Sequence, residues 1–513
     1  MKRSNYWVVV VLVAVLSATF FAFGAAAQDD AILRVGMRSP VTLDPALGTN
    51  DPEVLFNRQI YDYLVDLSPS GELVPALATN WQISDDGLTY TFDLAEGVTF
   101  HDGSPFTSAD VVFTFNRLKE VESSALGLLG DFTVEADGPN RVVFTLAGPN
   151  ADFMYGVASR FAFILKDGTT NPNQIGEDGS LTNFTGTGPF VLSAYNPGES
   201  ATFARNENYW VDGQPVLDGL QFIFIEDDSA KIDALRSGTV DFIFKIPDDQ
   251  IPLLEAEDTL NILVQQTNTH PVIRLRSDEG HLGEDVRIRQ AFKYATDREL
   301  LNLDVMDGMG IVGNNDPIGP VYGQFYTPQE VQPYDPEMAC QLIGEAGYTD
   351  DAGNPRLEVE FYVVEAFNYP TLAQFMQQQW EEGCIYAELL IRPENIYYGD
   401  NEWMEVDLSL TGWGTRPVPQ EYLNVAYVSD GVFNESHWSD PELDTLAAEA
   451  AITADPDARK AIYAQISAIF NERGPIIIPF FRPIYGAASA NVQGLEMHPF
   501  PGRTDFRTVS VTG

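Results

Sequence analysis

Positive charge is scarce in this sequence of 513 residues. Lysine and arginine together number 29 against 75 aspartate and glutamate residues, so the formal net charge at pH 7 is −46. A surface of this sign repels nucleic acids and anionic membranes, and the sequence predicts neither as a partner. The acidic residues are spread along the whole chain, which we interpret as a solvation adaptation to a saline habitat. A moderately acidic secreted protein is the alternative, and it explains the sign of the charge better than its size.

Cysteine and histidine are also rare. The two cysteines, Cys340 and Cys384, and the five histidines show no spacing typical of a metal site, so we predict no metal ligand. In an oxidising compartment the two cysteines could form one disulfide. The chain-entropy model gives a bridge over a loop of about 44 residues roughly 4 kcal/mol of stabilisation. Two buried thiols are the alternative.

Catalytic signatures are missing. The sequence has no G-x-S-x-G, H-E-x-x-H, Walker or dinucleotide-binding motif. The glycine-rich segment Gly186–Phe190, GTGPF, has no Lys-Ser/Thr pair or helix after it, which favours a turn over a phosphate loop. Paired carboxylates arise by chance in so acidic a chain, so counting alone leaves a secreted glycosidase as an alternative. We predict no enzymatic activity and no cofactor.

Only one apolar run approaches the length that crosses a bilayer. It extends from Trp7 to Gly24, follows Lys2-Arg3 and precedes three alanines and the polar residues from Gln28 onward. A charged start, an apolar stretch and small residues predict an export signal over residues 1–27, and an uncleaved membrane anchor is the alternative. No cysteine follows the alanines, so a lipoprotein is not predicted. We expect a periplasmic protein without stable membrane insertion after signal cleavage.

The clearest structural pattern lies in the segment from Val74 to Arg117. Hydrophobic residues alternate with polar ones in two short runs, and turn residues and a helix-capping residue follow in order. The segment predicts a strand containing Trp81 and Ile83, a hairpin turn at 85–87, a strand over 90–94, a turn at 102–103 and a helix capped by Thr107 or Ser108.

This segment closely resembles the signature of the family 5 extracellular solute-binding proteins, the bacterial receptors of ABC importers for peptides, nickel and opines. Further matching motifs are the Leu-Asp-Pro turn at residues 43–45, GTGPF at 186–190, RNENYW at 205–210 and VRIRQA…YATDR at 286–298. The resemblance covers about Ile32 to the C-terminus. It implies an α/β fold of the periplasmic binding protein type II kind, with two α/β lobes joined by a hinge and an inserted third lobe.

The resemblance also implies how the chain divides. Residues 28–50, 184–268 and 483–513 would form a discontinuous lobe I, residues 51–183 an inserted lobe II, and residues 269–482 lobe III. Thr269-His270-Pro271 would be a crossover between lobes I and III. Strands alternating with helices after residue 336 predict a mostly parallel sheet covered by helices in lobe III.

The strand around Trp413 is the main candidate ligand site. In family peptide receptors the equivalent strand offers main-chain groups to an extended ligand, which adds to the strand edge. Carried over, this role falls on Gly412, Trp413 and Gly414, facing Met37, Arg38 and Ser39 of lobe I. We expect the Trp413 ring to stack on the ligand, with a role in the core as the alternative.

The next residues depart from the family pattern. Peptide-binding members carry an aspartate shortly after the tryptophan, where it pairs with the peptide ammonium group, whereas this chain has Thr415-Arg416 and no carboxylate before Glu421. A guanidinium facing a cleft binds carboxylate or phosphate. Arg416 therefore predicts a ligand with an anionic group, such as an opine-like conjugate or a peptide held by its C-terminus. An ion pair between Arg416 and a nearby acidic residue is the alternative.

Two other side chains are weaker candidates. Arg276 lies on the same strand face as Arg274 and could enter the cleft, or it could pair with Asp278 and Glu279 at a solvated edge. Asn315 lies in a loop that resembles a ligand-approaching segment of the family, although turn formation explains it equally well.

These observations predict a receptor of an ABC importer that binds a peptide or a peptide-like, anionic and opine-like solute between its lobes. Its partners would be this ligand and the permease subunits, and we expect a monomer. An oligosaccharide-binding member of the same family is the alternative, a nickel or haem receptor is also known in the family, and a secreted hydrolase represents another class.

Overall fold

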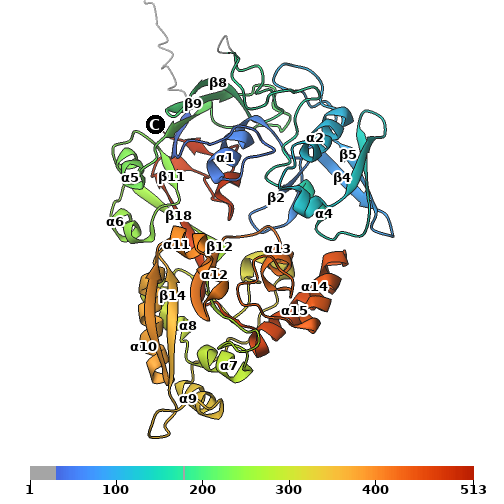
Figure 1. The fold of residues 1–513 in the computed structure, drawn as a ribbon. Coiled ribbons are helices and arrows are strands. Elements are labelled where there is room, and N and C mark those ends of the chain that lie inside the picture. The colour runs from blue at the N-terminus through green and yellow to red at the C-terminus, as the bar shows by residue number, and fades with distance from the viewer. Residues whose placement is uncertain (1–30, 177–179, 513) are drawn as a thin grey trace, which may run out of the picture.

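The computed structural model describes residues 31–176 and 180–512 (Figure 1). The predicted export signal, residues 1–27, lies outside this range. None of the helices in the described part of the chain is long and apolar enough to cross a membrane. We keep the lobe names as labels, and the boundaries between the lobes remain predictions.

One twelve-stranded sheet extends through lobes I and III (Figure 1). Its strands are β1 (Ile32–Met37), β8 (Phe190–Asn196), β9 (Ser200–Arg205), β10 (Gly219–Phe224), β11 (Phe242–Phe244), β12 (Leu260–Leu275), β13 (Ile311–Val312), β14 (Leu357–Val364), β15 (Ile385–Arg392), β16 (Leu408–Trp413), β17 (Ile476–Ile477) and β18 (Phe480–Ser489). The main order is β15-β14-β16-β12-β18-β11-β1-β10-β9-β8, with β13 on β18 and β17 on β12. This continuous sheet joins the α/β lobes.

The strands of this sheet run in both directions. Parallel pairs join β1 to β10 and β11, and β14 to β15 and β16. Strands β12 and β18 are antiparallel to each other, and β12 is antiparallel to β16. The parallel pairing expected for the strands that alternate with helices after residue 336 is therefore confirmed, and the antiparallel neighbour β12 enters lobe III from lobe I.

The crossover at Thr269-His270-Pro271 lies inside one long strand. Strand β12 continues for 16 residues from lobe I into lobe III, and its pairing with β18 shifts register between Gln266 and Thr269. The apolar run at residues 476–481 predicts one buried strand, but the structure divides it into β17 and β18 on either side of Ile478-Pro479. The connection between the lobes is thus made by neighbouring, paired strands.

Lobe II follows its sequence pattern closely. A four-stranded antiparallel sheet has the order β4-β5-β7-β6, and α2 begins after the capping residue Thr107, whose hydroxyl accepts a hydrogen bond from the Ala109 amide at 3.3 Å. Gly87 has φ +70° in the predicted hairpin turn. The elements are β4 (Ala78–Ile83), β5 (Thr89–Leu94), α2 (Ser108–Glu120), α3 (Leu126–Leu129), β6 (Phe132–Ala136), β7 (Arg141–Leu146) and α4 (Phe153–Val157).

The remaining elements surround these sheets. The helices are α1 (Asp51–Ile60), α5 (Asp228–Arg236), α6 (Ile251–Glu255), α7 (Val286–Tyr294), α8 (Arg298–Met306), α9 (Pro336–Glu345), α10 (Tyr369–Glu382), α11 (Glu394–Gly399), α12 (Glu402–Glu405), α13 (Pro419–Tyr422), α14 (Pro441–Ile452) and α15 (Pro456–Arg473). Two short ladders pair β2 (Val65–Leu67) with β3 (Leu73–Pro75) and β19 (Val492–Gln493) with β20 (Ser510–Val511). Separate hydrophobic clusters underlie the two large lobes and lobe II.

The sequence predicts a helix over residues 54–63, whereas α1 ends at Ile60, where the chain is closely packed. The Ile60 carbonyl accepts a hydrogen bond from the Gly188 amide at 2.9 Å, so it is engaged outside the helix. A side chain at Gly186 or Gly188 would overlap the backbone of Ile60. The glycines of the GTGPF segment therefore permit a close approach between two parts of the chain, and this segment is not a phosphate loop.

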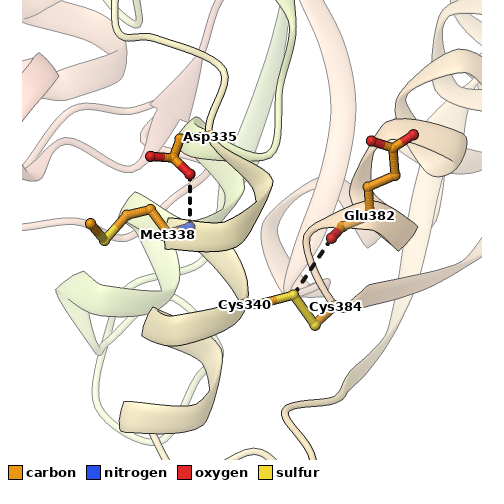
Figure 2. The surroundings of a disulfide bond; sticks show 5 residues. All are labelled: Asp335, Met338, Cys340, Glu382 and Cys384. Carbon is orange, nitrogen blue, oxygen red and sulfur yellow. Dashed lines mark hydrogen bonds between the residues drawn. A yellow bond between two sulfur atoms is a disulfide. The ribbon is translucent and has the colours of Figure 1, made fainter.

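A disulfide joins Cys340 on α9 to Cys384, which follows α10 (Figure 2). The bridge closes a loop with a sequence separation of 44 residues, and the Cα atoms of the two cysteines are 5.0 Å apart. It connects the two helices that flank β14 in the sequence.

Candidate ligand-binding cavity

A cavity of about 510 Å³ lies between segments of all three lobes. Lobe I contributes residues 500–503, lobe II contributes the start of α1 and residues around α3 and α4, and lobe III contributes the loop after β16 and the chain near α13. Its charged lining residues are Asp51, Asp152, Arg160, Arg416, Glu421 and Arg503. The cavity is thus a mixed apolar and charged site formed by residues far apart in the sequence.

Arg416 lies in the wall of this cavity, in the loop between β16 and α13. Its guanidinium carbon is 5.5 Å from the centroid of the Trp413 ring, a distance at which the ring face attracts a cation. In the described ranges of the chain, its side chain makes no hydrogen bond or ion pair within 4 Å. The alternative of an ion pair with a nearby acidic residue is absent from this part of the chain.

Glu421 supplies a carboxylate close to Arg416. Burial raises the pKa of Glu421 to about 7; Arg416 and Arg160 oppose this shift, while Asp152 adds to it. Half of a group with this pKa is protonated near neutral pH. Glu421 can therefore release a proton when a positively charged ligand group approaches it.

Arg160 enters the cavity from lobe II, three residues after the end of α4. Burial lowers its pKa, Asp51 and Glu421 oppose the shift, and Arg416 adds to it. Its guanidinium carbon is 5.4 Å from the Phe161 ring centroid. As for Arg416, the described residues offer its side chain no ion pair within 4 Å.

The other three charges of the cavity have protein partners. Asp152 pairs with Arg459 of α15 at 2.6 Å, and the two side chains are only 8% and 3% exposed. Asp51 pairs with Lys245 and accepts a hydrogen bond from the Gly502 amide at 3.1 Å.

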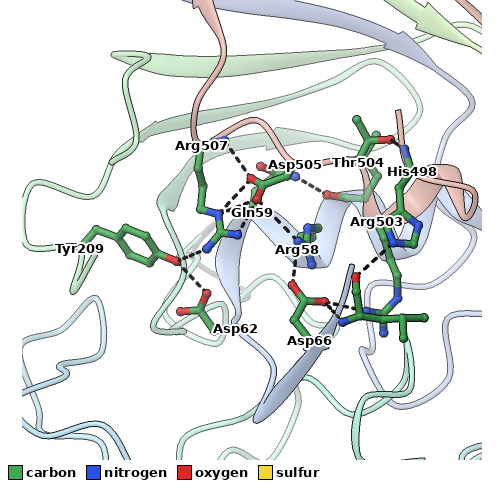
Figure 3. A network of polar contacts seen from close by, with 12 residues as sticks. Arg58, Gln59, Asp62, Asp66, Tyr209, His498, Arg503, Thr504, Asp505 and Arg507 are labelled. Carbon is green, nitrogen blue, oxygen red and sulfur yellow. Dashed lines mark hydrogen bonds and ion pairs between the residues drawn. The ribbon is translucent and has the colours of Figure 1, made fainter. Parts of the chain in front are cut away.

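Arg503 is held by a polar network behind the cavity (Figure 3). It donates a hydrogen bond to Asp66 at 2.7 Å, and Asp66 in turn accepts one from Arg58 at 2.9 Å. The network continues through Asp505 and Arg507 to Tyr209. Because these charges are paired with one another across lobes I and II, we expect other residues to bind the charged groups of a ligand.

The predicted site around Trp413 is divided between the cavity wall and the lobe III core. Thr415 lines the cavity with Arg416, and its hydroxyl accepts a hydrogen bond from the Asn268 amide at 3.0 Å. Trp413 packs edge-on against Tyr422 and Phe433, at centroid distances of 5.9 and 6.2 Å. Its ring therefore supports the cavity wall through Arg416.

The two glycines beside Trp413 have different surroundings. A side chain at Gly412 would overlap the hydroxyl of Tyr369, whereas a side chain at Gly414 would meet no atom within 4 Å. The Gly414 carbonyl accepts a hydrogen bond from the Tyr422 hydroxyl at 2.8 Å. Gly412 is exposed, but the Tyr369 hydroxyl occupies the space that a side chain at this position would need.

The lobe I candidates line a neighbouring cavity of about 450 Å³. Met37, Arg38 and Ser39 lie there, and Asp51 lines both cavities. The Ser39 amide donates a hydrogen bond to Glu226 at 2.9 Å, and Arg38 lies 3.4 Å from Asp228. The two halves of the predicted site thus line adjoining cavities.

Arg276 and Asn315 lie outside both cavities. Arg276 pairs with Asp278 at 2.8 Å, which is one of the two partners considered from sequence. Its second partner is Glu405, at 3.3 Å, and not Glu279. Asn315 is fully buried, with φ +62°, and accepts a hydrogen bond from Arg298. Arg274 is buried and donates hydrogen bonds to main-chain carbonyls around α12. Their bonding is internal to lobe III, and we do not include them in the proposed site.

Sequence reasoning missed Arg160, Asp51 and Asp152. Arg160 belongs to a stretch of lobe II without a motif, and only the packing of lobe II on lobe III brings it to Arg416 and Glu421. Within residues 31–176 and 180–512, no group of histidine, cysteine, aspartate or glutamate side chains is arranged to hold a metal ion.

Comparisons with known proteins identify related chains. The model of a family described as bacterial extracellular solute-binding proteins, family 5 middle, matches residues 72–434. Heme-binding protein A of Haemophilus influenzae is 27% identical over 519 residues, covering 93% of this chain and 91% of its own. Di/tripeptide-binding protein 1 of Pseudomonas aeruginosa is 26% identical, with coverages of 92% and 93%. The glutathione-binding protein GsiB of Escherichia coli is also 26% identical, with coverages of 95% and 96%.

Solved structures share the same fold. HbpA2 from Haemophilus parasuis superimposes with a TM-score of 0.82 at 26% identity, covering 94% of this chain and all of the other. A periplasmic murein tripeptide-binding protein, MppA, in its unliganded open form gives a TM-score of 0.82 at 21% identity, with coverages of 94% and 98%. At the latter identity the likeness concerns the fold alone.

Proposed function

This chain belongs to the bacterial extracellular solute-binding proteins of family 5, and from this premise we propose that Arg416 binds a carboxylate of its ligand. Proteins of this family are the substrate-binding proteins of ABC importers, and they bind peptides or related ligands. Family members are binding proteins, not enzymes. The proposal concerns which solute this member takes.

The observation that carries the proposal is the unpaired guanidinium of Arg416 in the cavity wall. Arg289 and Arg298 also lack an ion pair among the described residues, but both donate hydrogen bonds to main-chain carbonyls, whereas the Arg416 side chain makes neither kind of contact there. A partly buried guanidinium is best satisfied by a planar anion that accepts two hydrogen bonds, and a carboxylate has this geometry. An anionic peptide or an opine-like amino-acid conjugate provides such a group.

The names of the relatives support this class of ligand. They include proteins named for binding heme, di- and tripeptides, and glutathione, all of which carry carboxylates. We therefore propose a peptide or peptide-like, anionic solute. The cavity of about 510 Å³ is within the range of small-molecule sites.

In the proposed mechanism, the solute bridges lobes I, II and III and stabilises the conformation in which they surround it. A ligand shifts such an equilibrium only by its differential affinity for the two conformations. Contacts from all three lobes provide this difference, because they form together only when the lobes are adjacent. The loaded protein, a monomer in the periplasm, would then dock on the permease subunits of the importer.

The experiment that tests the proposal is a binding screen on the mature protein, its Arg416→Ala variant and its Arg416→Lys variant. Di- to pentapeptides, opines and cello-oligosaccharides are added at fixed concentration, and the unfolding midpoint is measured. A ligand raises the free energy of unfolding by RT ln(1 + [L]/Kd). We expect peptides or opines to stabilise the wild type and Arg416→Ala to lose at least ten-fold in affinity.

The matched control is Arg276→Ala, which removes an arginine that is paired outside the cavity. It should leave affinity unchanged. Oligosaccharide binding that survives Arg416→Ala would contradict the proposal and make the protein a sugar receptor. The Lys variant keeps the charge without the bidentate geometry and should bind with intermediate affinity.

A further inference from the structure

Three of the six charged residues that line the cavity have no protein partner in the described chain. Asp51, Asp152 and Arg503 are paired with Lys245, Arg459 and Asp66. Arg160, Arg416 and Glu421 remain, with no ion pair within 4 Å in residues 31–176 and 180–512. The unmatched charge of the cavity is therefore two guanidinium groups and one carboxyl group.

These three groups come from two lobes but lie close enough to interact electrostatically with one another. Arg160 is on lobe II, and Arg416 and Glu421 are on the lobe III segment after β16. Arg416 disfavours the charge of Arg160, and Glu421 favours it. Both arginines in turn favour the ionised form of Glu421.

The arrangement is unfavourable without a ligand. Two like charges repel each other, and partial burial removes the water that would solvate them. A single carboxyl group, half protonated near neutral pH, does not compensate for both arginines. An incoming molecule that supplies two anionic groups and one cationic group would satisfy all three residues.

We propose that Arg160 is a second ligand-binding residue, and that Arg160, Arg416 and Glu421 together select solutes with two carboxylates and one ammonium group. This inference rests on the proposed function, because it assumes that Arg416 binds a ligand carboxylate. The preferred class is amino-acid conjugates of net charge −1, such as glutamyl peptides or opines. Ordinary dipeptides, with one carboxylate and one ammonium group, leave one arginine unsatisfied.

The proposal makes lobe II a direct determinant of specificity. The Arg160 guanidinium is carried by a segment that contacts lobe III, where the Ala151 amide donates a hydrogen bond to the Ala451 carbonyl at 2.9 Å. A ligand that bridges Arg160 and Arg416 therefore adds an attraction between lobes II and III. Its second carboxylate strengthens both binding and the juxtaposition of the lobes.

The test compares peptides that differ by one charge. Calorimetry measures the Kd of glutamyl-alanine and glutaminyl-alanine, and of their alanine-extended tripeptides, on the wild type and on Arg160→Gln. We expect the wild type to bind the glutamyl peptides at least ten-fold more tightly. Arg160→Gln should reduce this preference to less than three-fold, while its affinity for the glutaminyl peptides stays within three-fold of the wild-type value.

Arg160→Lys separates the charge from the loss of packing, and Arg276→Gln is the control outside the cavity. The Lys variant should keep part of the preference for glutamyl peptides, whereas the control should keep all of it. An unchanged preference in a folded Arg160→Gln protein overturns this inference and leaves the role of Arg416 intact. If neither the peptides nor the opines bind to the wild type, the role of Arg416 and this inference both fail.

Discussion

Most arginine side chains in this acidic chain are matched by a carboxylate. Arg58 lies 2.9 Å from Asp66 and Arg276 lies 2.8 Å from Asp278, and Arg459 shares a buried pair with Asp152. Arg289 and Arg298 lack a carboxylate partner but donate hydrogen bonds to main-chain carbonyls. Against this background, Arg160 and Arg416 stand out because, within the described chain, their side chains make neither an ion pair nor a hydrogen bond. Because acidic residues outnumber basic ones by 75 to 29, an arginine rarely lacks a partner by chance. Arg160 and Arg416 are therefore the single residues whose substitution is most informative.

Glu421 should make the stability of the unliganded protein depend on pH. Burial raises its pKa from 4.5 to about 7, so the folded state favours the protonated form. This contribution is fully present below the unfolded pKa and is lost as the pH rises through the folded pKa. Between pH 5 and pH 8 the wild type should therefore lose more stability than Glu421→Gln, as measured by urea unfolding at both values.

Glu207→Gln is the control for this measurement, because Glu207 is an exposed carboxylate outside the cavity. It should show the pH dependence of the wild type. Equal pH dependence in the wild type and Glu421→Gln would mean that Glu421 titrates normally and is well hydrated.

At the scale of elements, local sequence patterns predict local structure well. The segment from Val74 to Arg117 has its two strands, hairpin turn and capped helix where alternation and turn residues indicate them. The end of α1 and the division at Ile478-Pro479 were not predicted correctly. In both cases the deciding contacts come from distant segments, such as the Gly188 amide that engages the Ile60 carbonyl.

The end of β16 provides a test of such a contact. Gly412→Ala should destabilise the protein by about 1–3 kcal/mol, because the new methyl group overlaps the Tyr369 hydroxyl in a packed region. Tyr369→Phe in the same protein should recover part of this loss, since it removes the overlapping oxygen. The free energies of unfolding in urea measure both effects.

The matched control is Gly414→Ala, two residues further along the chain, where an added methyl group meets no atom within 4 Å. It should change stability little. A Gly412→Ala protein as stable as the control would show that the Tyr369 side chain can shift to make room for the methyl group.

At the scale of the whole molecule, sequence reasoning reached the family and its fold but not the cavity. The lining of the cavity comes from three separated parts of the chain, and nothing local marks Arg160 or Asp152 as neighbours of Arg416. The antiparallel pairing of β12 with β18 has no local signal either, because the two strands are separated by more than 200 residues of sequence. Long-range pairing depends on the complete fold, which no window of sequence contains.

The buried pair between Asp152 and Arg459 tests how lobes II and III hold together. Arg459→Met should lower the free energy of unfolding by about 3–5 kcal/mol, because it leaves a carboxylate buried without a partner. Asp152→Leu combined with Arg459→Met removes both charges and should be more stable than the single variant. Urea unfolding provides the energies, and small-angle scattering reports any separation of the lobes.

If the double variant is no more stable than Arg459→Met alone, the loss comes from the packing of the arginine stem against Phe325 and Tyr463. The charge of Asp152 would then be solvated even in the folded protein. A scattering profile that is unchanged in every variant would mean that other contacts keep the lobes adjacent.

The position of β18 has a consequence for the order in which the protein can assemble during synthesis. This strand lies between β12 and β11 in the sheet, yet it spans residues 480–489, close to the end of the chain. A ribosome that has made the first 470 residues has produced a chain whose two half-sheets have no common strand. The nascent protein therefore cannot complete its central sheet until translation is almost finished. Until then, the edges of β12 and β11 that pair with β18 have no partner strand.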